Sequence, residues 1–365
     1  MIKKIDEIQF EKMPGKNGDI GLITLTRQQV LNALNHTMFL ALDENLAAWQ
    51  QDKSIKAIVI RAAEGRAFCA GGDIRHAYEM RKKNDETLPH FFRDEYRMNS
   101  RIHHYPKPFI ALLDGITMGG GVGISIHGSH RIGTPRLTFA MPETGIGFYP
   151  DVGTTYYLAR FPYKMGYYLG LTGVRINYAD CLAIGIVQEI VASESLSAIL
   201  TALSDATITD NESVTNILKP FSISVPDSEL MKHRETIEKC FAKNSVEEIL
   251  HALENESDEW SQQTAALLKT KSPTSLKVTF EALRHAAKMN FDESQEMEYG
   301  MTLNFIREHD FFEGIRAVII DKDQKPKWKP ATLKEVTPDM LENYFMPSAL
   351  RNDNVRHPER SEGST

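Results

Sequence analysis

The sequence has few cysteines, no excess of positive charge and no long apolar run. Its three cysteines, Cys69, Cys181 and Cys240, are too widely spaced for a metal site or a disulfide framework. A formal net charge of −7 argues against a general nucleic-acid-binding surface, although a local basic patch could still hold a small polyanion. No segment is apolar enough to span a bilayer, and the first residues lack the apolar run of a signal peptide. We therefore expect a soluble, cytoplasmic protein.

The first part of the chain alternates strand and helix patterns. Residues 18–27 alternate apolar and polar side chains, as a strand does, and an amphipathic helix follows that ends near Asp52. Residues 56–62 predict a buried strand, and a glycine-containing loop then leads into a helical segment over residues 74–104. This order of elements predicts an α/β fold with loops gathered at one end of a sheet.

The later part of the chain has a different pattern. From about residue 193 the glycine-rich loops disappear and helical periodicity dominates, with Ser272-Pro273-Thr274 as a clear helix start. From Pro347 the chain is polar and charged, with little to bury. The sequence therefore predicts three parts, namely a core with the active site over residues 1–192, a mainly helical region over 193–346 and a disordered tail over 347–365.

The stretch over residues 106–153 carries the chemistry. Three consecutive glycines, Gly119–Gly121, follow an apolar run, and two acids, Glu143 and Asp151, come soon after. Glycines let a backbone approach a ligand closely with its N–H groups free to point at it. A pair of carboxylates supplies one group to attack or act as base and another to position water. The residues predict an acyl-transfer site, with Asp151 also placed as the N-cap of the following helix.

Three motifs resemble the crotonase (enoyl-CoA hydratase/isomerase) superfamily. They are AFCAGGDIR, KPFIALLDGITMGGGVGIS and MPETGIGFYPDVG, while SPTSLKVT, HDFFEGIRAVIIDKDQ and PKWKP are similar to its 3-hydroxyisobutyryl-CoA hydrolase subfamily. The resemblance implies a spiral of repeated ββα units followed by a helical C-terminal region. It also implies an acyl-CoA substrate, with coenzyme A as part of that substrate and no metal or redox cofactor.

The resemblance assigns roles to individual residues. The backbone N–H groups of Gly72 and Gly120 are expected to form an oxyanion hole for the thioester carbonyl. Glu143 and Asp151 are the expected catalytic acids, and Glu95 is expected to bind the 3-hydroxyl of the acyl group. Further substrate contacts are expected in the loop after the first motif, at Asp73, Ile74 and Arg75. Arg66 and Arg75 are candidate cations for the coenzyme A phosphates.

Gly123 favours hydrolysis over hydration. The hydratases of this family use two glutamates, one of them three residues after the oxyanion glycine, where this chain has Gly123. Adding water across a double bond needs a proton donor and an acceptor on one face. Asp151 stands where the hydratases usually have glycine, as in the hydrolases. The expected reaction is therefore that of a thioesterase, releasing 3-hydroxyisobutyrate and coenzyme A in valine degradation.

Several alternatives stay open at this point. Glu143 either attacks the thioester to form a mixed anhydride or activates water, and Asp151 either handles water or holds the substrate hydroxyl. An enoyl-CoA hydratase or isomerase is a second reading, since an isomerase could use Glu143 alone. A non-catalytic acyl-CoA-binding protein is a third. The oligomeric state also stays open, because family members often trimerise through C-terminal helices and this chain has an extended C-terminal region.

Overall fold

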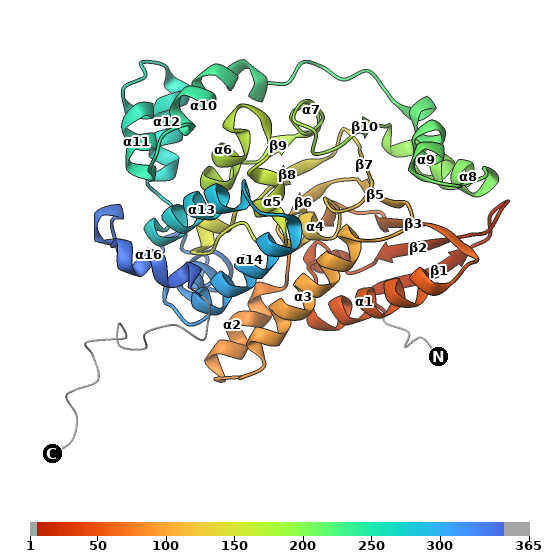
Figure 1. Cartoon of the computed structure of the whole chain (residues 1–365), viewed down its shortest axis with the longest axis horizontal. Helices are drawn as coiled ribbons and strands as arrows, with labels where there is room; N and C mark the ends of the chain where they lie inside the picture. Colours follow the sequence, from red (N-terminus) through yellow and green to blue (C-terminus); the bar gives the residue numbers. More distant parts are fainter. Residues whose placement is uncertain (1–5, 347–365) are drawn as a thin grey trace.

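The strands form two sheets in the computed structural model, which describes residues 6–346, so the predicted tail lies outside the described residues (Figure 1). The larger sheet has the order β1-β2-β3-β5-β7-β10, with bounds Ile8–Met13, Asp19–Leu25, Ile55–Ala62, Phe109–Leu113, His130–Gly133 and Glu189–Ile190. The smaller sheet has the order β4-β6-β8-β9, with bounds Ala67–Cys69, Ile116–Met118, Thr138–Ala140 and Ile176–Asn177.

From β3 to β8 consecutive strands alternate between the two sheets, as repeated ββα units require. In the larger sheet β3, β5 and β7 are parallel neighbours, while β4, β6 and β8 are parallel neighbours in the smaller one. The carboxyl ends of parallel strands lie at one edge of a sheet, which is where ligands bind in such folds. The loops after β4, β6 and β8 carry Gly72, Gly120 and Glu143, so the topology brings these residues to one edge.

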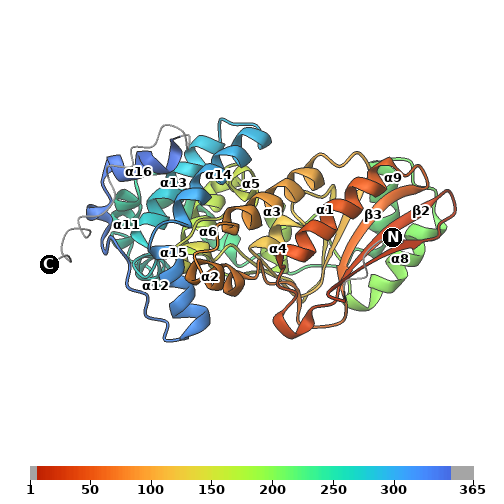
Figure 2. The same ribbon diagram turned by 90° about the horizontal axis from the view of Figure 1, so that it is seen from below.

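Helices cover both faces of the larger sheet. On one face lies α1 (His36–Gln51), whose Phe39 belongs to the same buried cluster as Ile58 of β3. On the other face lie α8 (Leu196–Asp205) and α9 (Asn211–Leu218), whose apolar residues cluster with Val59 of the same strand. Figure 2 shows α8 and α9 on the side of β2 and β3 opposite to α1. The alternation along β3 therefore divides its side chains between two apolar layers.

Residues 74–104 form two helices, so the prediction of one helical segment was wrong. The first, α2 (Ile74–Lys82), ends before Asn84, whose φ of 50° lies in the left-handed region. The second, α3 (Leu88–His103), has a proline in its first turn, where the missing N–H costs nothing. Between them Asp85 accepts hydrogen bonds from the N–H and hydroxyl of Thr87. The turn lets α3 run separately, packed alongside α1.

The chain after residue 193 is helical, as predicted. The Ser-Pro-Thr start is confirmed, because the Ser272 hydroxyl accepts the Ser275 N–H at 3.1 Å. The helix that Ser272 starts is α13 (Pro273–Ala286), and the other helices of this region, besides α8 and α9, are α10 (Arg234–Phe241), α11 (Val246–Glu254), α12 (Glu259–Leu268), α14 (Phe291–Phe305), α15 (Asp310–Ile315) and α16 (Pro338–Phe345). Two shorter helices, α6 (Met165–Thr172) and α7 (Tyr178–Ala183), lie before residue 193, on either side of β9 in the sequence. Within residues 6–346, no helix has both the length and the apolar character needed to cross a membrane.

The two main parts share one apolar core. Phe148, in the loop before α5 (Thr154–Leu158), lies against Phe305 and Phe311 with ring centroids 5.2 and 4.5 Å away. All three rings belong to one buried cluster. The boundary at residue 193 therefore stays a prediction.

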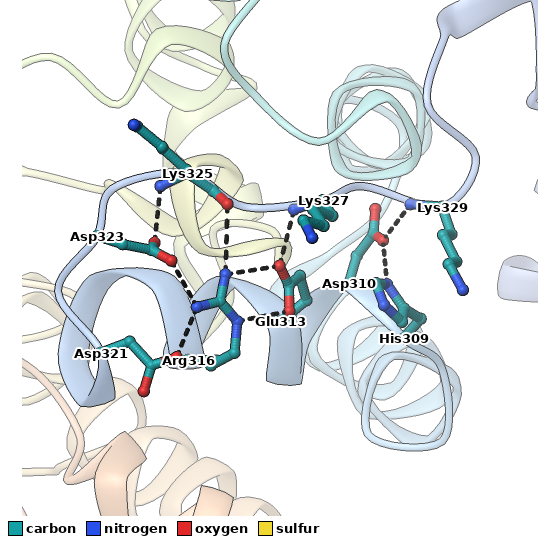
Figure 3. Close-up of polar contacts among 9 residues, drawn as sticks. All are labelled: His309, Asp310, Glu313, Arg316, Asp321, Asp323, Lys325, Lys327 and Lys329. Carbon is teal, nitrogen blue, oxygen red and sulfur yellow. Dashed lines mark hydrogen bonds and ion pairs between the residues drawn. The ribbon is translucent and has the colours of Figure 1, made fainter.

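Ion pairs and hydrogen bonds around Arg316 stabilise the segment that follows α15 (Figure 3). The Arg316 guanidinium pairs with Glu313 at 2.9 Å and with Asp321 and Asp323 at 2.7 Å each. Glu313 also accepts the Lys327 N–H at 2.8 Å. Nearby, Asp310 accepts the Lys329 N–H at 2.7 Å. The Arg316 guanidinium thus pairs with one carboxylate from α15 and with two from the turn that follows it. Together with the backbone hydrogen bonds of Lys327 and Lys329, these pairs hold the extended segment against α15.

Candidate active site

The two predicted oxyanion glycines lie next to each other. A β-carbon at Gly120, the first residue of α4 (Gly120–Gly123), would lie 3.0 Å from the Gly72 nitrogen and 2.7 Å from Glu95 Oε1. Only glycine leaves this space free, and Gly119 beside it has a φ of 49°. Within the described chain, neither the Gly72 N–H nor the Gly120 N–H donates a hydrogen bond. Two backbone donors without a hydrogen-bond partner in the described chain therefore lie close together.

Glu143 lies beside these glycines. It begins the 3₁₀ turn Glu143–Ile146, which is separated from β8 by Met141 and Pro142, and a β-carbon at Gly119 would lie 3.0 Å from its Oε1. The side chain is 6% exposed, and its Oε2 has no hydrogen-bond partner among the described residues. Burial, together with the charge of Asp151, holds the Glu143 pKa well above its usual range. A buried carboxylate with a free oxygen is available to a ligand.

Asp151 lies in the next loop and is oriented by a tyrosine. Tyr96 of α3 donates its hydroxyl to Asp151 Oδ2 at 2.6 Å, and Thr302 of α14 lies 2.7 Å from the same hydroxyl. Burial raises the Asp151 pKa to about 7, although the hydrogen bond from Tyr96 acts in the opposite direction. Asp151 therefore changes charge near neutral pH, which suits a group that exchanges a proton with water.

Glu95 completes a cluster of three acids. It lies on α3 just before Tyr96 and is 3% exposed. Its pKa is raised well above the usual range by burial and then by the negative charges of Asp151 and Glu143. In the described part of the chain no Lys, Arg or His forms an ion pair with any of these three acids. The structure thus brings Glu95, Glu143 and Asp151 together without a cation.

Glu298 of α14 supports the Asp151 loop and was missed by the sequence analysis. Its carboxylate accepts the Gly153 N–H at 2.6 Å, the Thr155 N–H at 3.1 Å and the Thr155 hydroxyl at 2.5 Å. Burial raises its pKa to about 8, outweighing these donated hydrogen bonds. The prediction that Asp151 caps α5 was wrong, because Gly153 is the N-cap and Glu298 satisfies the N–H groups. An acid on a helix carries no local signal that it will be buried.

The space beside Gly123 is already filled. A β-carbon there would lie 2.7 Å from Val152 Cβ and 2.9 Å from Asn99 Nδ2. Such distances are shorter than packed carbon and nitrogen atoms allow. A glutamate at this position, which the resemblance leads us to expect in a hydratase, would have to displace both neighbours.

The remaining predicted substrate contacts have other partners. Asp73 caps α2 and pairs with Arg27 at 2.8 Å, while the Ile74 N–H donates to the Gly72 carbonyl at 2.8 Å. Arg75 is exposed and donates to the Ile319 carbonyl at 2.9 Å. Within residues 6–346, no hydrogen bond or ion pair joins Asp73 or Arg75 to the three acids. Their expected contact with substrate stays a prediction.

Known sequences match the chain over nearly its whole length. The family model described as enoyl-CoA hydratase/isomerase matches residues 20–345. The 3-hydroxyisobutyryl-CoA hydrolase, mitochondrial, of Homo sapiens is 42% identical over 335 residues, which cover 90% of this chain and 87% of that protein. The protein of the same name from Gallus gallus is 41% identical over 346 residues, covering 93% and 89%.

Solved structures match the fold equally well. A carnitinyl-CoA dehydratase from Mycobacterium thermoresistibile is similar with a TM-score of 0.86 and 37% identity, covering 94% of this chain and 97% of that one. An enoyl-CoA hydratase from Rhodobacter sphaeroides is similar with a TM-score of 0.85 and 34% identity, covering 94% and 98%. The predicted fold, with its two sheets and helical C-terminal region, is thereby confirmed. The chain belongs to the enoyl-CoA hydratase/isomerase family, also called the crotonase superfamily.

Proposed function

We propose that this protein hydrolyses acyl-CoA thioesters, with 3-hydroxyisobutyryl-CoA as its substrate in valine degradation. The observation that carries the proposal is the free Oε2 of buried Glu143 beside the unpaired N–H groups of Gly72 and Gly120. The identity to proteins named as 3-hydroxyisobutyryl-CoA hydrolases supports the choice of substrate.

The chemistry needs no group beyond these residues and water. A Glu143 oxygen, or a water that Glu143 deprotonates, attacks the thioester carbon. The carbonyl oxygen becomes an oxyanion held by the Gly72 and Gly120 N–H groups, and coenzyme A leaves as a thiolate. In the first route Asp151 orients or deprotonates the water that hydrolyses the mixed anhydride. In the second route it positions the attacking water or the substrate hydroxyl.

A raised pKa fits this role for Glu143. A carboxylate that burial destabilises is a stronger base and nucleophile than one in water, once it is ionised. The lack of a cation keeps its electron pair free for the substrate. The fixed N–H donors supply the balancing positive charge only when the oxyanion forms.

Hydration is the second candidate, since two proteins of similar structure are named as a dehydratase and a hydratase. The experiment follows thiol release from 3-hydroxyisobutyryl-CoA beside the loss of double-bond absorbance of crotonyl-CoA. Thiol release alone supports the hydrolase, whereas consumption of crotonyl-CoA without thiol release overturns it. Failure of both reactions, with acyl-CoA binding retained, favours a binding protein.

The oxyanion hole is tested separately with Gly120→Ala. The added β-carbon would meet Glu95 Oε1 and the Gly72 nitrogen, so the two N–H donors can no longer share one oxygen. We expect kcat to fall by about 10²-fold. Gly145→Ala is the matched control, because its β-carbon would meet only Lys271 Nζ at 3.4 Å. Equal rates for both variants would contradict the assignment.

We also propose the cytoplasm as the location. The names of the vertebrate relatives place those proteins in mitochondria. Cell fractionation with an antibody to this chain distinguishes the two compartments, and recovery in an organelle fraction would overturn the proposal.

A further inference from the structure

A chain of buried hydroxyl groups leads away from Asp151. The Tyr96 hydroxyl lies 2.6 Å from Asp151 Oδ2, and Thr302 Oγ1 lies 2.7 Å from the Tyr96 hydroxyl. Thr302 Oγ1 is also 2.8 Å from the Tyr149 hydroxyl, which donates to the Glu298 backbone carbonyl at 2.5 Å. All five residues are buried. Their polar groups therefore depend on one another for hydrogen bonds.

This hydroxyl chain has more contacts than hydrogens to fill them. From Asp151 to the Glu298 carbonyl there are four oxygen–oxygen contacts of 2.5 to 2.8 Å, all at hydrogen-bond distance. A hydroxyl carries one hydrogen, whereas a backbone carbonyl and an ionised carboxylate carry none. Burial raises the pKa of Tyr96 and of Tyr149 well above the usual range, so both keep their hydrogens. With Thr302 they supply three hydrogens for the four contacts.

A proton on Asp151 Oδ2 supplies the missing hydrogen. Protonated Asp151 donates to Tyr96, Tyr96 to Thr302 and Thr302 to Tyr149, whose own hydrogen goes to the backbone carbonyl. When Asp151 ionises, Tyr96 donates to the carboxylate instead. One of the other contacts then joins two oxygens with no hydrogen between them, which is unfavourable in a buried position. The hydroxyl chain is complete only while Asp151 is protonated.

The charged groups around Asp151 also oppose its ionisation. Glu95 of α3, Glu143 of the 3₁₀ turn and Glu298 of α14 each have a pKa raised by burial, to which the charge of Asp151 adds. His127 Nε2 donates to the backbone carbonyl of the residue after Asp151 at 2.7 Å. Burial lowers the His127 pKa to about 3, so this ring brings no positive charge near neutral pH.

We infer that Thr302 and Tyr149 are positioning residues that act through Tyr96 to hold a proton on Asp151. The inference rests on the proposed hydrolase function, in the route where Asp151 takes up a proton from water and the hydroxide bonds to the acyl carbon. In Thr302→Val or Tyr149→Phe, two hydroxyl hydrogens remain for two contacts. Ionised Asp151 then leaves no contact without a hydrogen, so both variants favour the ionised form.

The pH dependence of kcat/KM for thiol release tests the sign of this effect. In Thr302→Val, which keeps the shape of the side chain, the apparent pKa of the rise should fall by about one unit. Thr264→Val is the control, because Thr264 is a buried threonine of α12 whose hydroxyl donates to the Trp260 carbonyl at 2.8 Å. Its profile should match that of the wild type. A merely structural loss would lower kcat/KM at every pH. An unmoved or raised apparent pKa in Thr302→Val would overturn the inference.

Carbon-13 NMR of the aspartate carboxyl groups measures the same property without turnover. Asp151→Asn identifies the Asp151 signal in protein labelled at the aspartate Cγ. The pH midpoint of that signal should fall in Thr302→Val and in Tyr149→Phe, and it should stay in place in Thr264→Val. Because the titration needs no substrate, it tests the hydroxyl chain even if the wild type hydrolyses no acyl-CoA. Tyr149→Phe replaces Thr302→Val in both assays if that variant does not fold. A midpoint that does not fall in the folded variants overturns the inference.

Discussion

The acids near the glycine loops and the acids around Arg316 lie in opposite electrostatic environments. The first group, here called the site acids, comprises Glu95, Glu143, Asp151 and Glu298, all of them buried and none in an ion pair within the described residues. The second group, the Arg316 acids, comprises Glu313, Asp321 and Asp323 (Figure 3). Burial raises the pKa of every site acid, whereas hydrogen bonds from Arg316 lower the pKa of Glu313 and Asp323.

The difference separates acids that are buried without a cation from acids that are paired with one. An acid beside a guanidinium gives up its electron pairs to strong hydrogen bonds and is a weak base. An acid that is buried without a cation costs stability when it ionises, but it then binds a proton or attacks a carbonyl more readily. Under the proposed function, Glu143 and Asp151 gain reactivity at a cost in stability, whereas Glu298 supports the Asp151 loop and the Arg316 acids hold a chain segment in place. Four experiments test this contrast.

The largest effect is expected from Glu143→Gln. The amide cannot attack or take up a proton, so thiol release should fall by at least about 10³-fold. Glu313→Gln makes the same chemical change among the Arg316 acids and should alter kcat by less than about threefold. Steady-state thiol release measures both. Comparable losses in the two variants would remove the distinction between the groups.

The pH dependence of activity should follow Asp151 and Glu143. Ionised Asp151 handles water and ionised Glu143 attacks or acts as base, so kcat/KM should rise with pH through the raised pKa values of both acids, that of Asp151 being about 7. Tyr96→Phe removes a hydrogen bond that favours the ionised form. We expect the rise to move to higher pH by about one unit. Tyr105→Phe is the control, since the Tyr105 hydroxyl donates to the Leu46 carbonyl, away from Asp151. A shift to lower pH would contradict the role of Tyr96.

The two groups should make stability depend on pH in opposite directions. In the folded protein the pKa of Glu298 is raised from 4.5 to about 8. Its contribution to the free energy of unfolding is therefore complete below pH 4.5 and is lost as the pH rises toward 8. The folded pKa of Glu313 is lowered, so its contribution is complete above pH 4.5 and is lost as the pH falls below it.

Thermal unfolding from pH 4 to pH 9 measures both slopes. Glu298→Gln should change the melting temperature by an amount that depends on pH, so that its decline between about pH 5 and pH 8 becomes flatter. Glu313→Gln should leave that decline in place and reduce the loss of stability in acid. Parallel curves for the wild type and Glu298→Gln would show that Glu298 is ionised in the folded protein throughout this range.

The smallest effect is expected from Arg316→Met. Its pairs are partly exposed, with 23% of the Arg316 side chain accessible, so salt screens them. We expect the melting temperature to fall by a few degrees at low ionic strength and by less at high ionic strength, with kcat unchanged. A large loss of activity would mean that the Arg316 segment supports the active site.

Much of the fold was predictable because local patterns agreed with the tertiary structure. The strand predicted over residues 56–62 is β3, and Ser272 starts α13 as its side chain and the following proline indicate. The break after Lys82 was missed because a left-handed Asn84 and a short turn leave no gap in helical periodicity. The wrong N-cap at Asp151 has a different cause. An aspartate just before a helix is a common N-cap, so the sequence favoured Asp151. In the structure the Asp151 side chain instead accepts the hydrogen bond of the Tyr96 hydroxyl.

Sequence motifs alone were enough to nominate the candidate site residues and their order along the chain. The glycines at 72, 119 and 120 and the acids at 95, 143 and 151 follow from motifs, because backbone approach and proton transfer each need particular residue types. Only the tertiary structure decided which acids are buried without a cation, that Glu298 supports the Asp151 loop, and that Asn99 fills the space beside Gly123. The physical reason is that a pKa and a packing contact depend on all neighbouring groups in space, and here those neighbours come from helices far apart in the chain.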